Sequence, residues 1–384
     1  MELSLVNFRV DSGWSAPLPP VDGPTTLVVV FGASTFLDRP EALAELRAAY
    51  PTARLIGCST AGEIFGTKIH DESLAVAIVR FARTEVRAAC QPIAAATESF
   101  ATGAALAAAL AGPGLRGVFV LSDGLHVNGT ELVRGLAGGL PADVVVTGGL
   151  AGDGARFERT WVLADDGAPA GDRVAAIGLY GDHVRIGHGS KGGWDAFGPR
   201  RTVTRSAGNV LFELDGKPAL QLYKEYLGER AQGLPATGLL FPLALGGDDD
   251  GRKIVRTILA IDEEARSLTF AGDIPEGSRA QLMKANFDRL IEGAEEAGAG
   301  ARSTLRMAQG EAPAGDVLAL AISCVGRRLV LGERTEEEVE ATVEALPRGT
   351  QQIGFYSYGE LSPHASGPCE LHNQTMTLTT ICER

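Results

Sequence analysis

Apolar residues along the chain gather in short runs, and between residues 26 and 79 these runs follow a clear order. An apolar strand (LVVVFGAS) is followed by a helix (RPEALAELRAAYP), a second strand (ARLIG), a turn of small residues (CSTAGE) and a third strand (SLAVAIVRF). The strands do not alternate cleanly between apolar and polar residues, which is typical of strands covered on both faces. The pattern therefore predicts a β-α-β-turn-β module.

The same order occurs twice more. Residues 117–164 contain GVFVLSDG, a helix around TELVRGLAGGLP, ADVVVTG, the turn GLAGD, and ERTWVLA. Residues 316–384 contain DVLALAISC, the helix TEEEVEATVEALP, TQQIGFYSYGEL and LHNQTMTLTTI. In each copy about 30 residues lead from the first strand to the turn, the length of a βαβ unit. We expect an α/β fold in which repeated modules form mixed sheets.

Residues 180–310 have a different texture. Segments such as RRTVTRSA, KIVRTILAID and ARSLTFAG alternate between polar and apolar residues, which predicts a more β-rich insertion in the C-terminal half. A short helix is expected in KPALQLYKEYLG, and a longer one from Ser278 to Glu296. We expect an N-terminal extension (1–25), a first domain with two module copies (26–214) and a second domain (215–384) with the third copy at 316–384.

The three turns share a glycine that is followed directly by an acid. They read IGCSTAGE from Ile56, VTGGLAGD from Val146 and IGFYSYGE from Ile353. Ligands of open α/β sheets bind beyond the carboxyl ends of strands, where these turns fall. Each turn is therefore either a ligand cradle or a tight link whose acid binds nearby N–H groups. The candidate ligand-binding residues of the first two copies are Cys58, Ser59, Thr60, Gly62, Glu63, Ser122, Asp123, Gly149, Gly152 and Asp153.

Asp123 follows the first strand of the second copy and precedes a helix. Its carboxylate is suited either to accept from a ligand amine or to cap the N-terminus of that helix. Both interpretations stay open at this point.

The third copy carries the densest group of polar and aromatic residues in the chain. A strand through LHNQTMTLT places His372 and Gln374 on one face and Asn373 on the other. The group forms either a pocket wall or a buried hydrogen-bond network. Its candidate ligand-binding residues are Tyr356, Tyr358, Glu360, His372 and Asn373.

No catalytic residue or resident metal is assigned from the sequence. GCSTAG differs in spacing from a nucleophile elbow, and Cys58 is more typical of a small buried residue than of a nucleophile. GHGSKG (187–192) is not followed by a helix that could bind a pyrophosphate. Cys369 and His372 lack the second ligand pair of a structural zinc site. An enzyme that uses Glu63 or Glu360 as acid or base stays a weaker alternative.

The amino-acid composition disfavours several classes of binding partner. The 48 acidic and 35 basic residues give a net charge of −13, which repels nucleic acid and anionic lipid. The five cysteines are odd in number and scattered, and neither a signal peptide nor a long apolar run is present. We expect a cytoplasmic protein that binds neither nucleic acid nor a membrane.

Several of these motifs resemble the FIST family. They are GCSTAGEI from Gly57, GGLAGD from Gly148, DGKPALQLYKEYLG from Asp215, GDIPEGS from Gly272, GFYSYGEL from Gly354 and ELHNQTMTLT from Glu370. The resemblance implies an N-terminal FIST domain followed by a C-terminal one, in a non-enzymatic sensor of prokaryotic signal transduction.

That resemblance also implies a ligand and a partner. FIST proteins are proposed to recognise small molecules such as amino acids, and they are joined to, or encoded beside, kinases, cyclases or methyl-accepting chemoreceptors. We expect this chain to signal through a separate partner of that kind. Some members of the wider family are similar to haem-containing nitric oxide sensors, so haem held by His372 as axial ligand is the alternative.

Overall fold

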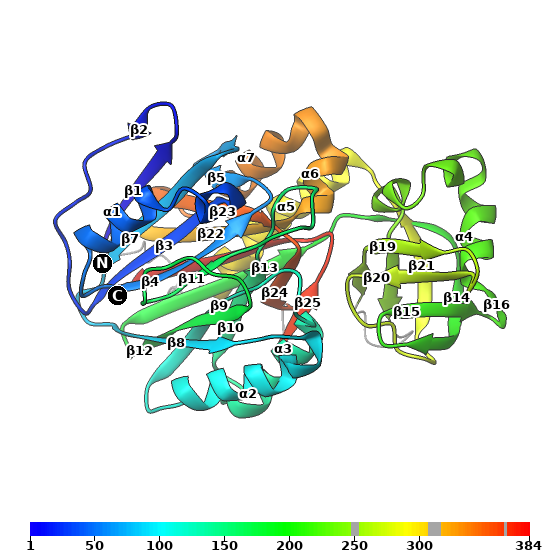
Figure 1. Cartoon of the computed structure of the whole chain (residues 1–384), viewed down its shortest axis with the longest axis horizontal. Helices are drawn as coiled ribbons and strands as arrows, with labels where there is room; N and C mark the ends of the chain where they lie inside the picture. The colour runs from blue at the N-terminus through cyan, green and yellow to red at the C-terminus, as the bar shows by residue number, and fades with distance from the viewer. Residues whose placement is uncertain (247–252, 306–315, 365–366) are drawn as a thin grey trace.

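Three sheets enclose one apolar core, and a β-rich domain lies beside them (Figure 1). The computed structural model describes residues 1–246, 253–305, 316–364 and 367–384. Within these residues each of the three sheets has six strands, and we name the body that the three sheets form around their common core the prism. Parallel and antiparallel pairs occur in all three sheets, which confirms the predicted mixed α/β class.

The first sheet is built around the first module. Its outer face is covered by α1 (Glu41–Ala49), whose buried Leu43 and Leu46 pack on Val28 and Val30 in one apolar cluster. Its strands, in spatial order, are β11 (Val162–Leu163), β4 (Arg54–Thr60), β3 (Thr26–Ala33), β7 (Ser73–Arg80), β1 (Glu2–Arg9) and β2 (Gly13–Trp14).

The second sheet contains the strands of the second module. Helices α2 (Ser99–Leu110) and α3 (Gly129–Gly139) cover its outer face (Figure 1). Its strands, in spatial order, are β25 (Cys369–His372), β24 (Gly359–Pro363), β10 (Val145–Leu150), β9 (Leu115–Ser122), β12 (Arg173–Tyr180) and β8 (Glu85–Pro92).

The third sheet contains the strands of the third module. Helices α5 (Phe287–Thr304), α6 (Val325–Leu331) and α7 (Thr335–Ala345) lie on its outer side. Its strands, in spatial order, are β13 (Val184–Lys191), β26 (Met376–Glu383), β22 (Val317–Cys324), β23 (Thr350–Ser357), β5 (Glu63–Phe65) and β6 (Lys68–His70).

The inner faces of the sheets share a core. Phe31 of the first sheet and Phe355 of the third are completely buried, and their ring centroids lie 4.7 Å apart. Phe119 and Ile177 contribute from the second sheet. Because each sheet is apolar on both faces, its strands show the continuous apolar runs that the sequence displays.

Each module sends the strand after its turn into a neighbouring sheet. After the first turn, β5 pairs with β23 of the third sheet. After the second turn, β11 pairs with β4 of the first sheet, and after the third turn, β24 pairs with β10 of the second. The exchange is cyclic, so the three turns lie at the same end of the prism.

The strand predicted in ERTWVLA is present as β11, which lies in the first sheet, and the strand that returns to the second sheet is β12. One sequence-based assignment was wrong in detail. The segment from Ser278 begins as β21 (Arg279–Lys284), paired on both sides, and α5 starts only at Phe287. Asn286 stops the strand pattern because its side chain caps that helix, accepting from Arg289 N at 3.4 Å.

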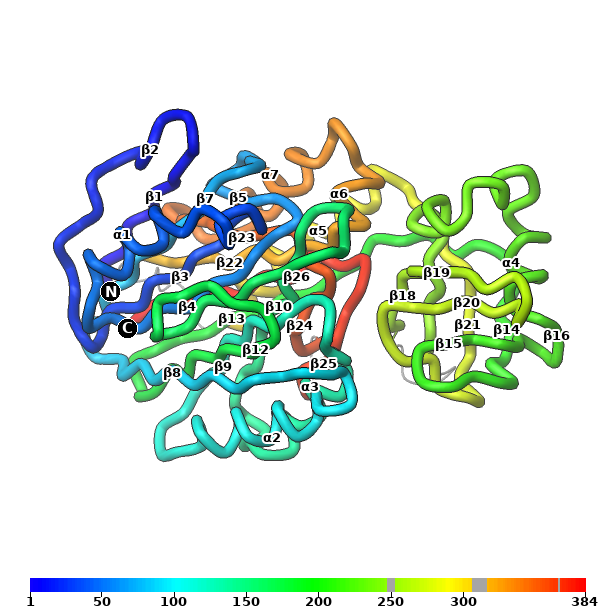
Figure 2. The backbone as a smooth tube through the Cα atoms, viewed as in Figure 1, coloured from blue at the N-terminus to red at the C-terminus, as the bar shows by residue number. Residues whose placement is uncertain are grey.

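The β-rich domain, which we name the inserted domain, spans residues 195–284 between β13 and α5. Leu211, Leu220, Tyr223 and Phe270 are buried in its own core. Figure 2 shows the two chain connections to the prism at the end opposite the termini. Its elements are β14 (Asp195–Ala207), β15 (Val210–Leu214), β16 (Lys217–Pro218), α4 (Ala219–Leu227), β17 (Leu243–Gly246), β18 (Ile254–Arg256), β19 (Ile258–Asp262), β20 (Ser267–Phe270) and β21.

Candidate functional site

The three turns are joined by backbone hydrogen bonds into one assembly, which we name the turn ring (residues 57–63, 147–153 and 354–360). Gly152 N donates to Ser59 O at 2.9 Å, which joins the second turn to the first. Ala61 N donates to Tyr356 O at 2.7 Å, and Tyr358 N donates to Leu150 O at 3.2 Å. These contacts join the third turn to the other two. The sequence motif that occurs three times therefore forms a single site.

In the first turn Glu63 is buried and closes its own loop. Its carboxyl group accepts from Thr60 Oγ1, from Ser73 Oγ at 2.8 Å and from Ser73 N at 3.1 Å. Burial raises its pKa from 4.5 to about 8, against the lowering effect of these donors. Glu63 is therefore neutral over most of the physiological range.

The third turn repeats this arrangement. Ser357 Oγ donates to Glu360 at 2.7 Å, as Thr60 does to Glu63, and Thr375 N donates to the other oxygen at 3.3 Å. Burial raises the pKa of Glu360 to about 8 as well. In both turns the acid connects the turn to the N-terminal end of the strand that returns to its sheet.

The second turn differs because its acid is ionised. Burial acts to raise the pKa of Asp153, but hydrogen bonds from Tyr358 and from three backbone N–H groups lower it overall. These N–H groups belong to Phe157, Glu158 and Arg159, at 2.8–3.0 Å. Tyr358 thus connects the third turn directly to the acid of the second.

Asp123 lies beside the second turn but does not cap the following helix. Its carboxylate accepts from Leu125 N and His126 N, and Asn128 is the residue that caps α3, accepting from Glu131 N at 3.2 Å. α3 starts at Gly129, seven residues after β9 ends at Ser122, so the capping interpretation of Asp123 was wrong. Ser122 is completely buried at the end of β9.

Four other predicted residues have mainly internal contacts. Cys58 lies in the core between the sheets, where burial raises the pKa of its thiol, and Ser59 Oγ accepts from Trp161 N at 2.9 Å. A Cβ on Gly149 would lie 3.0 Å from Ile322, and one on Gly152 would lie 3.0 Å from Ala61 N. Because Gly149 and Gly152 have no side chain, the turns can approach one another closely.

Tyr356 belongs to a buried hydrogen-bond network. Its hydroxyl lies 3.3 Å from Glu338 Oε1, and Glu338 is paired with Arg327. Ser323 Oγ donates to the same oxygen at 2.7 Å. For Tyr356 the structure matches the buried-network interpretation of the third-copy cluster.

Asn373 differs from the bonded residues above and shares with Ser122 Oγ a buried polar side chain without a hydrogen-bond partner in the described part of the chain. It is 1% exposed, yet neither Nδ2 nor Oδ1 has a hydrogen-bond partner within the described residues. Its neighbours in the chain are tightly held, since Thr375 N binds Glu360 and Thr375 O accepts from Cys324 N at 3.2 Å. A buried amide costs about 1–3 kcal/mol unless a water molecule or another polar group pairs it.

The inserted domain contacts the prism next to Asn373. Arg256 Nη1 donates to Leu371 O at 3.0 Å, and Trp194, the residue just before the inserted domain, donates through Nε1 to Gln374 O at 2.7 Å. Asn128 Nδ2 donates to Asp273 Oδ1 at 3.2 Å. Figure 1 shows the inserted domain facing the end of the prism that carries α6, β24 and β25.

His372 does not offer the geometry of a haem ligand. It is 4% exposed, and its Nε2 donates to Ser362 O at 2.9 Å. Its ring lies edge-on to His364, with centroids 4.7 Å apart, and burial lowers its pKa to about 4. The residues around His372 leave no open face for a planar cofactor, so we derive no step through haem.

Two residues that contact the turn ring were not predicted from the sequence. Phe157 stacks on Tyr358 with ring centroids 4.3 Å apart, and it is 48% exposed. Arg328 of α6 donates to Ala61 O at 2.7 Å and forms a bidentate ion pair with Asp71 at 2.7–2.8 Å. The left-handed backbone of Phe157, with φ 56°, has no signal in a single sequence.

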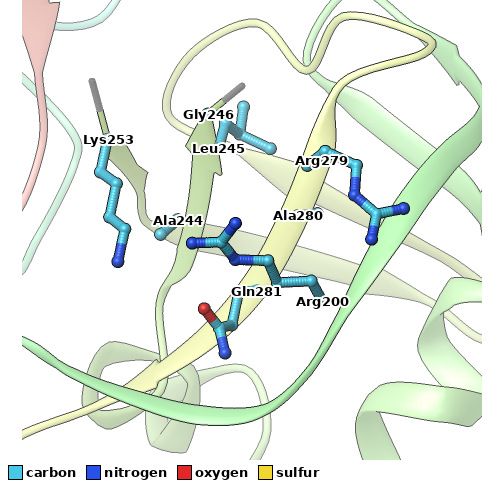
Figure 3. Close-up of a pocket in the computed structure, with 8 residues that line it drawn as sticks. All are labelled: Arg200, Ala244, Leu245, Gly246, Lys253, Arg279, Ala280 and Gln281. Atoms are coloured by element: carbon cyan, nitrogen blue, oxygen red, sulfur yellow. The ribbon is translucent and has the colours of Figure 1, made fainter. Parts of the chain in front are cut away.

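A separate small pocket lies within the inserted domain (Figure 3). Arg200, Lys253 and Arg279 line it together with Gln281 and the backbone of β17 and β21. The cavity measures about 20 Å³, room for a single water molecule. None of the turn-ring residues lines it.

Comparison with known proteins defines the family. The chain matches the FIST N domain over residues 26–217 and the FIST C domain over residues 219–363. It therefore belongs to the FIST family, whose domains are associated with sensing and signal transduction. The resemblance of the six sequence motifs to this family is confirmed.

Individual relatives add little about function. An uncharacterized protein of Methanocaldococcus jannaschii, MJ1623, is 28% identical over 168 residues, which are 39% of this chain and 31% of that protein. The chain thus matches about a third of the relative's length. The crystal structure of a cyanuric acid hydrolase from A. caulinodans aligns with 78% of this chain and with 99% of its own chain, at 14% sequence identity. The TM-score of 0.17 is too low to indicate a shared fold.

Among the described helices, none has the length and apolarity needed to span a membrane.

Proposed function

We propose that this FIST protein is a non-enzymatic sensor that binds a small polar molecule where the turn ring meets the inserted domain. The observation that carries the proposal is the buried, unpartnered amide of Asn373. An amide offers two donors and an acceptor, which suits the carboxylate and ammonium groups of an amino acid or a related metabolite. Such a ligand would recover the hydrogen bonds that the protein leaves unmade.

The position of this site would allow ligand binding to change the arrangement of the two domains. Asn373 precedes Gln374, whose carbonyl accepts from Trp194 at the entry to the inserted domain, and Thr375 in the same segment binds Glu360 of the third turn. A ligand that binds one arrangement of the two domains more tightly shifts the protein toward that arrangement. We propose that a separate kinase, cyclase or chemoreceptor reads this change.

A thermal-shift screen tests ligand binding. Wild-type protein and the Asn373→Leu variant are heated with a panel of amino acids and related metabolites. A ligand at 100 times its Kd stabilises the fold by about 2.7 kcal/mol, so a hit raises the wild-type melting temperature. Because Asn373 makes no side-chain hydrogen bond, the leucine variant should be at least as stable as wild type but should lose the response.

The matched control is Asn209→Leu in the inserted domain. Asn209 Nδ2 donates to Phe270 O at 2.7 Å, so this variant should melt at a lower temperature yet keep the full ligand response. A panel without a hit, or a hit that is unchanged in Asn373→Leu, contradicts the proposed site.

A further inference from the structure

The geometry points to a binding site for one divalent transition-metal ion formed by Asp123, His126 and Asp172. His126 Nδ1 lies 3.1 Å from Asp123 Oδ2 and 2.9 Å from Asp172 Oδ1. The three ligand atoms lie within 4.8 Å of one another. A metal ion bonded at about 2.0–2.2 Å to each atom requires separations of at most about 4.4 Å, which a slight movement of exposed side chains provides.

The backbone of the second sheet brings the two acids together. Asp123 follows β9 and Asp172 precedes β12, and these strands pair with Val174 opposite Ser122. Asp123 N donates to Arg173 O at 3.0 Å, and Asp172 N donates to Asp123 Oδ2 at 3.0 Å. The spacing of the acids is therefore fixed by a rigid sheet, which favours a preorganised site.

The three side chains differ in exposure in a way that suits coordination. The side chain of Asp123 is 2% exposed, and Thr160 Oγ1 donates to its other oxygen, Oδ1, at 3.2 Å. The side chains of His126 and Asp172 are 52% and 65% exposed. One ligand is thus held by its neighbours, while solvent and small anions can reach the remaining coordination positions.

The combination of nitrogen and oxygen ligands favours transition-metal ions. One imidazole and two carboxylates suit Zn²⁺, Mn²⁺ and Co²⁺, whereas Mg²⁺ prefers an all-oxygen shell. The site is independent of the small-molecule proposal, because none of its three ligands is needed to pair the Asn373 amide. It adjoins the turn ring, since a Cβ on Gly124 would lie 1.9 Å from Ala151 O of the second turn.

Metal binding would also connect the turn ring to the inserted domain. The loop from Asp123 ends at Asn128, which donates to Asp273 of the inserted domain. An ion that joins His126 to Asp172 fixes this loop to the sheet. The loop then holds Asn128 in the position that contacts Asp273.

The test uses untagged, chelator-treated protein titrated with Co²⁺ and Zn²⁺. We expect one Co²⁺ per chain with visible d–d absorption, displaced by Zn²⁺, and calorimetry should show the same stoichiometry. Loss of a ligand in His126→Ala or Asp172→Asn should weaken affinity by at least about 10- to 100-fold, the loss seen when even outer-shell partners of a metal are removed. Mg²⁺ should not compete at equal concentration.

Asp166→Asn is the matched control. Asp166 is an exposed acid on the same strand connection, paired with Arg173 at 2.8 Å, and it lies outside the ligand set. This variant should bind Co²⁺ as wild type does. Circular dichroism of each variant checks the fold, which the exposed positions of His126 and Asp172 should preserve. Absence of saturable Co²⁺ binding in wild type, or equal affinity in all variants, overturns the site.

Discussion

Arg327 and Glu338 form an ion pair in which both side chains are completely buried. Arg327 Nη2 lies 2.7 Å from Glu338 Oε2, and Arg327 Nε donates to the same oxygen at 2.8 Å. The guanidinium also donates to Leu290 O at 2.8 Å and to Gly192 O, while Ser323 and Tyr356 bind the other carboxylate oxygen. The pair thus connects α6, α7 and the entry to the inserted domain.

Removing one partner of this pair should destabilise the protein strongly. Arg327→Met or Glu338→Leu leaves the other charge buried and unpaired, which costs about 3–5 kcal/mol of unfolding free energy. The double variant should lose clearly less than the sum, because no unpaired charge remains. Chemical denaturation of the four proteins measures the cycle, and additive losses would show that the two side chains act independently.

The neutral acids of the turn ring predict an unusual pH dependence. Glu63 and Glu360 have pKa values of about 8 in the folded protein, against the usual 4.5. Between these values the folded state binds more protons than the unfolded state. The unfolding free energy should therefore be highest below pH 4.5 for these groups and fall as the pH rises toward 8, by up to about 1.4 kcal/mol per unit for each group.

Glutamine variants check this dependence. Gln has the shape of a protonated Glu, so Glu63→Gln and Glu360→Gln should each reduce the slope of unfolding free energy between pH 5 and 8. Glu295→Gln on the exposed face of α5 is the control and should keep the wild-type slope. Wild-type slopes in both turn variants would mean that these carboxyl groups are ionised in the fold.

Close strand approach predicts a strong effect of adding one methyl group. A Cβ on Gly354 would lie 1.8 Å from Ala321 O of the paired strand β22, and Gly148 and Gly57 face Val120 O and Val30 O at 1.9 and 2.5 Å. Gly354→Ala should cost about 1–3 kcal/mol or more, since backbone on both sides must shift. Gly138→Ala in α3 has open space around it and should instead stabilise by about 0.5–1 kcal/mol. Equal melting temperatures of Gly354→Ala and the wild type would show that the paired strands tolerate the added methyl group.

Much of this fold could be read from the sequence, because repetition and apolar runs are strong signals. The β-α-β-turn order and the shared acid identified the three turns as equivalent. The exchange of strands could not be predicted, since β11 has two residues and β5 has three, too few to carry a period. The approach of His126 and Asp172 depends on the register between β9 and β12, which no local pattern encodes.

The sequence also marked the polar residues of the third copy without separating their roles. Tyr356 and Asn373 both belong to that cluster, yet Tyr356 is bonded within the protein and Asn373 is not. The difference arises from side-chain directions at the corner between two sheets. Patterns of residue type do not contain this information.

Tyr358 should control the order of the loop after the second turn. Its hydroxyl donates to Asp153 and accepts from Asp153 N at 3.1 Å and Phe157 N at 3.3 Å. Tyr358→Phe removes these bonds but keeps the ring that stacks on Phe157, so we expect a loss of about 1–2 kcal/mol. Amide hydrogen exchange should quicken over residues 153–159. Tyr226→Phe, which removes a hydroxyl bonded to Arg201 in the inserted domain, should leave that exchange unchanged. Unaltered exchange in Tyr358→Phe would show that the three N–H bonds to the Asp153 carboxylate hold the loop without it.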